Sequence, residues 1–199
     1  MGTGLAQRSN VEAMLSGVAG AQFIKEAFHI PIETLSFGTD SHLVDGQSTM
    51  ESALVAQLMA VSRTCDLLGG AGGSDSGQAC SPIQLILDNT LAGMLKRIIT
   101  GLKVNDDTLA WEEIMNIAPG DGFITLPHTF QHCHDALRPN LLNKTSFGEW
   151  VADGSKGLHA RVLDEYLVLK DKLTPVELSD DVRREIQKIV KRADENLIN

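Results

Sequence analysis

Cysteine and basic residues are scarce in this chain of 199 residues. The three cysteines, Cys65, Cys80 and Cys133, lack the paired spacing of a metal site and leave one thiol unpaired in any disulfide scheme, which favours a reducing cytoplasmic setting over secretion. Only 17 lysines and arginines stand against 26 acidic residues, giving a net charge of -9. Because phosphate contacts need clustered lysine and arginine, this charge argues against a nucleic acid or an anionic membrane as partner.

A leader sequence and long apolar runs are also missing. The first ten residues, MGTGLAQRSN, lack the basic start and apolar run of a signal peptide. Charged residues interrupt the longest apolar stretches well before the length of a membrane span. With 43% hydrophobic and 22% charged residues the composition is that of a globular protein, and we expect one domain over residues 1–199.

Most of the chain has the apolar periodicity of amphipathic helices. Asn10 is a candidate N-cap of the first helix, and Pro31 follows its end. Ser48 with Glu51 is a candidate capping box for the second helix. For the third helix, Ser81 with Gln84 is the candidate box. Helices are predicted over residues 11–27, 48–63, 82–100, 108–117, 147–152, 158–172 and 180–197, with a short one after Pro127.

Extended segments alternate with the first of these helices. Residues 32–37 and 65–68 are short and β-biased, and each precedes a helix, while residues 123–126 are a candidate last strand. Strands that alternate with helices are typical of a parallel sheet. A closed barrel needs eight such units and about 250 residues. The predicted fold is therefore α/β, the carboxyl-terminal part of a TIM (β/α)8 barrel with additional C-terminal helices.

The polar loop after the first predicted strand is the best candidate site. Parallel sheets place their chemistry at the carboxyl ends of strands, where the backbone is fixed and the loop stays open to ligand. His42 is the only basic side chain here, so the loop favours a cation over a phosphate. In the competing interpretation, the acids only form turns and Glu51 only caps the next helix. The candidate substrate-binding residues are Asp40, Ser41, His42, Asp45 and Gln47.

Five glycines lie in the sequence GGAGGSDSG, residues 69–77, after the second predicted strand. A phosphate cradle is one interpretation, but the loop has no lysine, carries Asp75, and lacks both P-loop and dinucleotide spacings. We interpret it as a flexible wall of the substrate pocket, with Gly70 and Gly72 in contact with substrate.

Histidines 128 and 132 are four residues apart, which places them on one helical face as metal ligands require. The HExxH arrangement and an accompanying cysteine pair are absent, so hydrogen-bonded histidines packed in a helix are the favoured interpretation. No metal site is predicted, and no catalytic residue is assigned.

Several motifs resemble one family of enzymes. They are GTDS at 38–41 with Asp45, Gln47 and Glu51 at their present spacing, and then residues 81–114, 119–139 and 181–194. Together they cover nearly the whole chain and resemble the trimethylamine methyltransferase superfamily, the MttB-type corrinoid-dependent methyltransferases. His42, Leu43 and Val44 depart from the lysine, apolar and proline residues that the resemblance leads us to expect.

This resemblance implies a TIM-barrel enzyme that moves a methyl group from a tertiary or quaternary methylamine to the cobalt of a corrinoid on a separate protein. The chain would be its carboxyl-terminal portion, of the non-pyrrolysine type, which directs attention to quaternary amines such as glycine betaine. The corrinoid would be carried by the partner protein, with none bound by this chain alone. The carboxylates of Asp40 and Asp45 would hold the ammonium, and the scheme needs no general acid or base.

Two other functions stay open at this level. A truncated barrel could lack turnover and act through homo-oligomerisation or by docking on a complementing subunit, because an incomplete barrel exposes sheet edges and apolar faces. Alternatively, a barrel protein could bind an anionic ligand at the glycine-rich loop. Whether this chain by itself is an active enzyme is not decided by its sequence.

Overall fold

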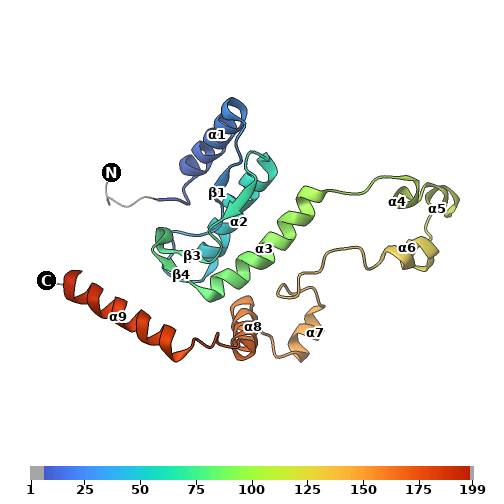
Figure 1. Ribbon diagram of the computed structural model, residues 1–199. Helices are drawn as coiled ribbons and strands as arrows, with labels where there is room; N and C mark the ends of the chain where they lie inside the picture. Colours follow the sequence, from blue (N-terminus) through green and yellow to red (C-terminus); the bar gives the residue numbers. More distant parts are fainter. Residues whose placement is uncertain (1–6, 198–199) are drawn as a thin grey trace. The chain divides into compact units, whose positions relative to one another are not determined.

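Helices dominate the computed structural model, which describes residues 7–197 (Figure 1). The chain divides into two compact units, with the boundary between Tyr166 and Leu167. The strands are β1 (Glu33–Leu35), β2 (Leu67–Gly69), β3 (Gly73–Ser74) and β4 (Ala79–Cys80). The longer helices are α1 (Val11–Phe28), α2 (Gly46–Ser62), α3 (Pro82–Thr100), α8 (Leu158–Lys172) and α9 (Asp180–Leu197). The shorter ones are α4 (Asp106–Leu109), α5 (Trp111–Asn116), α6 (Pro127–His132) and α7 (Phe147–Ala152).

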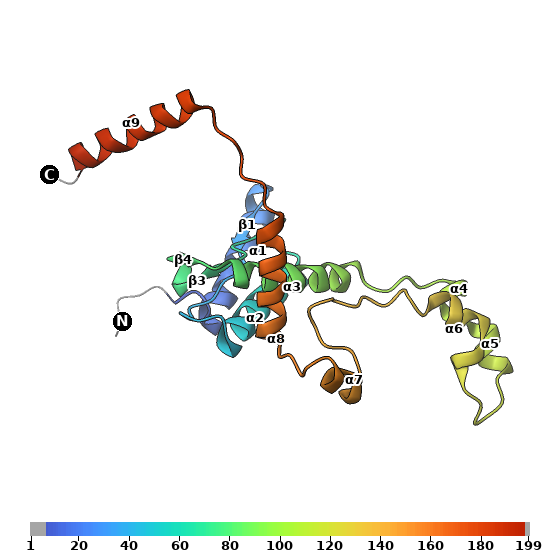
Figure 2. The same ribbon diagram turned by 90° about the horizontal axis from the view of Figure 1, so that it is seen from below.

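One β-α-β unit forms the centre of the first compact unit. β1 and β2 are parallel, with Glu33 opposite Leu67 and Leu35 opposite Gly69, and α2 connects them. The chain then forms a small antiparallel ribbon, β3 with β4, whose strands lie together in Figure 2. This order confirms the two parallel strands and their helices that the sequence predicts.

The apolar core lies between the strand pair and its helices. Phe37, two residues after β1, packs with Ala56 and Ala60 of α2 and with Leu95 of α3. A second cluster joins α1 to α2 and consists of Met14, Val55 and Met59. The small side chains of Ala56 and Ala60 allow close helix packing. α2 is thus covered by α3 through the first cluster and by α1 through the second.

Helix starts agree only in part with the predicted caps. Asn10 caps α1 as expected, and its side chain accepts from the N–H of Ala13 at 2.7 Å. The box predicted for α2 is wrong, because Asp45 is the N-cap and Ser48 its reciprocal partner. Aspartate three residues upstream of a serine makes the same pair of bonds, one turn earlier than the serine–glutamate pair.

Ser81 caps α3 as predicted, with Gln84 N–H as donor at 3.3 Å. The reciprocal half of that box is wrong. The side chain of Gln84 donates instead to Asp88, and the Ser81 N–H donates to the carbonyl of Gly72.

Two predictions further along the chain are also wrong. Residues 123–126 are not a strand, because Phe123–Thr125 form a 3-10 turn. A strand needs a hydrogen-bonding neighbour, and this segment pairs with neither of the two sheets found in the described residues. The single helix predicted for residues 108–117 is two helices, separated by Ala110 at a φ of 48°. Alanine has no preference for that conformation, so the break has no signal in the sequence.

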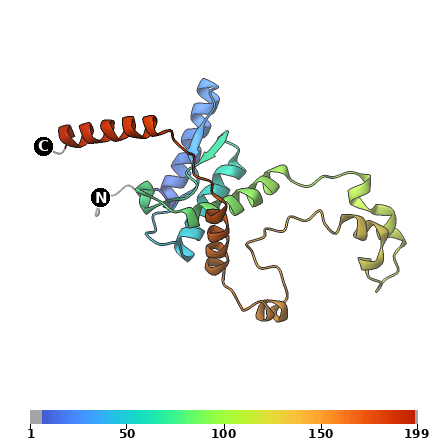
Figure 3. The same cartoon turned by 60° about the horizontal axis from the view of Figure 1, so that its bottom comes forward.

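Short helices and extended runs make up the chain between α3 and α8, as Figure 3 shows. Here α4, α5 and α6 lie together in all three views, and pocket-lining residues of all three helices confirm their proximity. Three helices, α7, α8 and α9, have the bounds that the sequence predicts. Along residues 7–197, none of the helices combines the length and the apolar character of a membrane span.

The mixed α/β character of the predicted fold is confirmed. Two parallel strands with a connecting helix fit a barrel segment, but they do not close a barrel. The barrel therefore stays a prediction, as does the single domain over residues 1–199.

Candidate functional site

Two loops meet at the carboxyl ends of β1 and β2. The first follows β1 over residues 36–45, and the second is the glycine-rich loop, residues 69–77. Ser36 and Phe37 both donate their N–H to the carbonyl of Gly69, at 3.0 and 2.9 Å. These bonds extend the parallel pairing past the strands, so the loops start from adjacent, fixed positions.

Backbone hydrogen bonds then join the loops to each other. Asp75 N–H donates to the carbonyl of Ser41 at 3.0 Å, and Ser76 N–H donates to the carbonyl of Thr39 at 3.1 Å. On the surface, His42 Nδ1 lies 2.9 Å from Oδ1 of Asp75. Asp75 and Ser76 therefore join the glycine-rich loop to the loop that carries most of the predicted site residues.

Asp40 lies at the centre of this arrangement. Its carboxylate accepts the N–H groups of Arg8 and Ser9, at 3.1 and 3.0 Å, and the hydroxyl of Ser76 at 2.9 Å. One aspartate thus connects the segment before α1, the loop after β1 and the glycine-rich loop. Three donors to one carboxylate offset much of its charge locally.

Glu51 holds the first loop from α2. Its Oε2 accepts the hydroxyl of Thr39 at 2.5 Å and the N–H of Asp40 at 2.9 Å, while Oε1 accepts from the amide of Gln47 at 2.8 Å. Thr39 is buried, and its hydroxyl also accepts the N–H of Ser41. Glu51 thus fixes the backbone of the loop, in place of the capping role predicted for it.

Ser41 and Asp45 shape the remainder of the loop. The buried Ser41 hydroxyl donates to the carbonyl of Leu43 at 3.0 Å. Asp45 Oδ1 accepts the N–H groups of Gln47 and Ser48 at 2.9 and 3.1 Å, which is its N-cap role. Both side chains are engaged within the protein.

Gly70 and Gly72 have positive φ angles, +88° and +83°. A Cβ on Gly70 would lie 2.6 Å from the carbonyl oxygen of Phe37, so only glycine fits this approach of the two loops. Gly72 donates its N–H to Asp88 at 2.8 Å. The glycines thus permit close backbone packing.

A buried polar network centred on Asp88 of α3 holds the glycine-rich loop at Gly72. Asp88 of α3 is 1% exposed and accepts from the Ser52 hydroxyl at 2.6 Å, from the Gln84 amide at 2.9 Å and from Gly72. Ser52 and Asp88 were not predicted, and Gln84 was predicted only as a capping partner of Ser81, because helical periodicity singles out the apolar face of α3. Their signal is a polar pair four residues apart, Gln84 and Asp88, among the apolar positions of that helix.

The meeting point of the loops encloses a cavity of about 260 Å³. Of the predicted substrate-binding residues, only Gly70 lines it. Asp40 does not line it, but its hydrogen-bond partners Arg8, Ser9 and Ser76 do. Other lining residues are Leu35, Phe37, Gly38, Thr39, Val55, Ala71, Gly73, Gly77, Ala79 and Cys80. Ser41, His42, Asp45, Gln47 and Gly72 are not among the residues that line this cavity either.

This geometry defines an α/β protein with a small cavity at the carboxyl ends of parallel strands. The family described as Trimethylamine methyltransferase (MTTB) matches residues 3–197, and the chain belongs to this family. The family resemblance read from the motifs is therefore confirmed.

Individual relatives agree with this assignment. The chain is 32% identical over 176 residues to the trimethylamine methyltransferase MttB of Methanosarcina barkeri (strain Fusaro), a match that covers 86% of this chain and 34% of the relative. It is 26% identical over 177 residues to that of Desulfitobacterium hafniense (strain DCB-2), covering 89% of the chain and 36% of the relative. It is also 28% identical over 115 residues to the glycine betaine methyltransferase of D. hafniense (strain Y51), covering 57% and 24%. The chain thus spans about a third of the length of the first two relatives.

Proposed function

We propose that this chain supplies the carboxyl-terminal part of a TIM-barrel methyltransferase that moves a methyl group from a tertiary or quaternary methylamine to the cobalt of a corrinoid on a separate protein. The observation that carries the proposal is the family match over residues 3–197. Because the chain spans about a third of the relatives that it matches, the activity is proposed for a closed barrel and not for these residues alone.

The cavity between the two loops is the proposed amine site. About 260 Å³ suits a small molecule such as a methylated amine. In this proposal Gly70 contacts the substrate directly and Asp40 supplies the negative field. Ser41, His42, Asp45, Gln47 and Gly72 are proposed to shape the loops around the substrate.

The hydrogen bonds that surround Asp40 suit such a reaction. Positive charge leaves the amine as its methyl group departs, so a strong ion pair with the bound ammonium would stabilise the ground state and slow transfer. Donors from Arg8, Ser9 and Ser76 already offset part of the Asp40 charge. The carboxylate then attracts the cation without holding it too tightly.

No proton transfer is required of this chain. When the bond between nitrogen and the methyl carbon of a quaternary ammonium breaks, both electrons of the bond stay on nitrogen. The leaving group is then a neutral amine, which needs no proton. The work of the chain's own residues is to orient one methyl group and to exclude water, which the closely packed loop backbones favour. We therefore assign no acid or base.

The corrinoid is proposed to arrive on its own carrier protein. A cavity of about 260 Å³ is far smaller than a corrinoid, so these loops fit the amine and not the cofactor. When bound opposite the amine, a cobalt(I) corrinoid supplies the nucleophile that accepts the methyl group.

Glycine betaine and related quaternary amines are the proposed substrates, and the cytoplasm is the proposed location. One relative carries the name glycine betaine methyltransferase. An anionic ligand at the glycine-rich loop is less well supported, because the N–H groups of Gly72, Gly73, Asp75 and Ser76 already donate within the protein. Those donors would have to be free to cradle a phosphate.

A methylation assay with the complete protein tests the proposal. Free cobalt(I) cobalamin takes the place of the carrier-bound corrinoid, and its visible absorbance reports methyl transfer. Glycine betaine is expected to give methylcobalamin, and Asp40→Asn to reduce the rate relative to Asp121→Asn, an acid outside both loops. Absence of methyl transfer from every methylated amine, with intact folding, would favour a non-catalytic protein that acts through oligomerisation or a partner.

A further inference from the structure

Two imidazoles and one carboxylate come together away from the loops. His128 and His132 share one face of α6, with ring centroids 4.2 Å apart. Asp107 reaches them from α4, and one ligand atom from each of the three residues lies within 4.8 Å of the others. Two histidines and a carboxylate are a donor set that zinc and other first-row divalent metals take.

His132 is already oriented as a metal ligand would be. Its Nδ1 lies 2.7 Å from Oδ2 of Asp135, which accepts Nδ1–H and leaves Nε2 to bind a metal. That Nε2 lies 3.7 Å from Oδ2 of Asp107. Two ligands of a tetrahedral zinc lie roughly 3.3 Å apart, so a small shift admits the ion between them. A carboxylate behind a coordinating histidine is a common metal-site arrangement.

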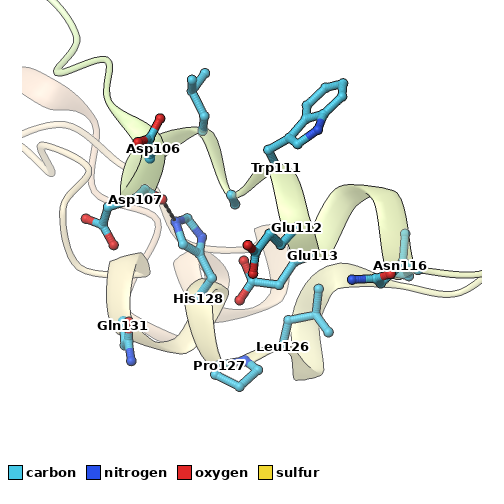
Figure 4. Close-up of a pocket in the computed structure, with 13 residues that line it drawn as sticks. Asp106, Asp107, Trp111, Glu112, Glu113, Asn116, Leu126, Pro127, His128 and Gln131 are labelled. Atoms are coloured by element: carbon cyan, nitrogen blue, oxygen red, sulfur yellow. Dashed lines mark hydrogen bonds between the residues drawn. The ribbon is translucent and has the colours of Figure 1, made fainter.

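His128 needs one exchange of partners. At present its Nε2 donates to the carbonyl of Asp107 at 2.7 Å, the hydrogen bond drawn in Figure 4. A metal at Nε2 replaces this bond, and water can take the place of the imidazole at the exposed carbonyl. The exchange is local and leaves both helices in place.

The surroundings favour a cation. Asp107 and His128 line the pocket of Figure 4, which has a volume of about 700 Å³. Asp106, Glu112 and Glu113 line it as well, and their charges attract a metal ion. Three protein ligands leave one coordination position for water or for a molecule in this pocket.

We propose that Asp107, His128 and His132 bind one divalent transition metal ion, represented by zinc, and that Asp135 positions His132. The ion connects α4 to α6, helices of four and six residues. The spacing of His128 and His132 within one helix favoured packed, hydrogen-bonded histidines without a metal. The third ligand comes from another helix, which spacing within α6 cannot reveal.

Calorimetric titration of zinc into the metal-free full chain tests the site. The pH should exceed the ordinary histidine pKa of about 6.5 so that protons do not compete. One zinc per chain is expected, with affinity at least about tenfold weaker in Asp107→Asn and His132→Gln. The matched controls, Asp121→Asn and His134→Gln, remove an aspartate and a histidine that do not line this pocket, and both should bind zinc as the parent does.

Cobalt(II) gives a second measurement that does not depend on affinity. The parent should show the intense visible bands of tetrahedral cobalt, and His128→Gln should lose them while its circular dichroism stays unchanged. Asp135→Asn should weaken zinc binding by about 10- to 100-fold. The proposal is overturned if zinc does not bind, if ligand variants and controls bind alike, or if Cys133→Ser alone abolishes binding.

Discussion

The carboxylate of Glu51 accepts the backbone N–H of Asp40 at 2.9 Å, across eleven residues of sequence. A side chain of α2 thereby fixes the loop that the family motif occupies. The same carboxylate accepts the Thr39 hydroxyl, so two consecutive residues of the loop depend on it.

Glu51→Ala should destabilise the protein by about 1.5 to 3 kcal/mol, the usual range for hydrogen bonds to a charged group. Urea unfolding measures the change in the free energy of unfolding. Gln57→Ala, at an exposed position of the same helix, serves as control and should change it by less than about 0.5 kcal/mol. Equal effects of the two variants would contradict a structural role of Glu51.

Asp88 is buried with three hydrogen-bond donors around it. Asp88→Ala should cost about 3 kcal/mol or more, because the Ser52 hydroxyl and the Gly72 N–H lose their acceptor away from water. Ser52→Ala removes one donor and keeps the carboxylate, so a smaller loss of about 1 kcal/mol is expected. A loss below about 1 kcal/mol for Asp88→Ala would show that the network does not hold the glycine-rich loop.

Gly70 and Gly93 make a matched pair for the role of glycine. Gly70→Ala combines a φ of +88° with a Cβ 2.6 Å from the Phe37 carbonyl, and should destabilise by about 2 kcal/mol or more. Gly93 lies within α3 with nothing near its Cβ position, so Gly93→Ala should stabilise by roughly 0.5 to 1 kcal/mol. Thermal unfolding of both variants should give shifts of opposite sign, and shifts of equal sign would refute the close approach of the loops.

Asp66 gives a prediction on pH. The hydrogen bond from Lys25 at 2.7 Å, and then that from the Ile32 N–H, lower the pKa of Asp66 below its ordinary value. A carboxyl with a lowered folded-state pKa adds stability above its unfolded-state pKa of about 3.9, and this is lost as pH falls through the folded-state pKa. In Lys25→Met, an NMR titration should place the Asp66 pKa closer to 3.9. An unchanged pKa would mean that Lys25 is not its main cause.

Apolar exposure predicts association. Leu35 and Leu67, on the two strands of the parallel pair, are 56% and 59% exposed, and two paired strands leave two open edges. We expect the 199-residue chain to self-associate or to bind a complementing polypeptide. Sedimentation velocity should show concentration-dependent species. A stable monomer with cooperative unfolding would contradict this expectation.

Much of the fold follows from local sequence signals. Asn10, Ser81 and the apolar spacing of the helices predict where α1 and α3 begin, because capping and amphipathic periodicity act over only a few residues. Errors occur where two local solutions compete, as at Asp45 and Ser48, or where a strand would need a distant partner, as at residues 123–126.

The sequence predicts where the candidate site lies, but not the contacts that its side chains make. The motif around residues 38–51 identifies the family and locates the loop. Which of its side chains face a ligand is decided by bonds from elsewhere in the chain: Ser76 to Asp40, and Glu51 to the loop backbone.

By itself, the sequence determined the order of β1, α2, β2 and α3, the acidic character of the loop after β1 and the family of the chain. Only the tertiary structure decided that Asp40, Glu51 and Asp88 hold the two loops together, and that Asp107 joins the histidines of α6. The physical reason is the separation in sequence of the residues that interact. Caps and helical periodicity arise between residues a few positions apart, whereas these contacts form between segments that only folding brings together.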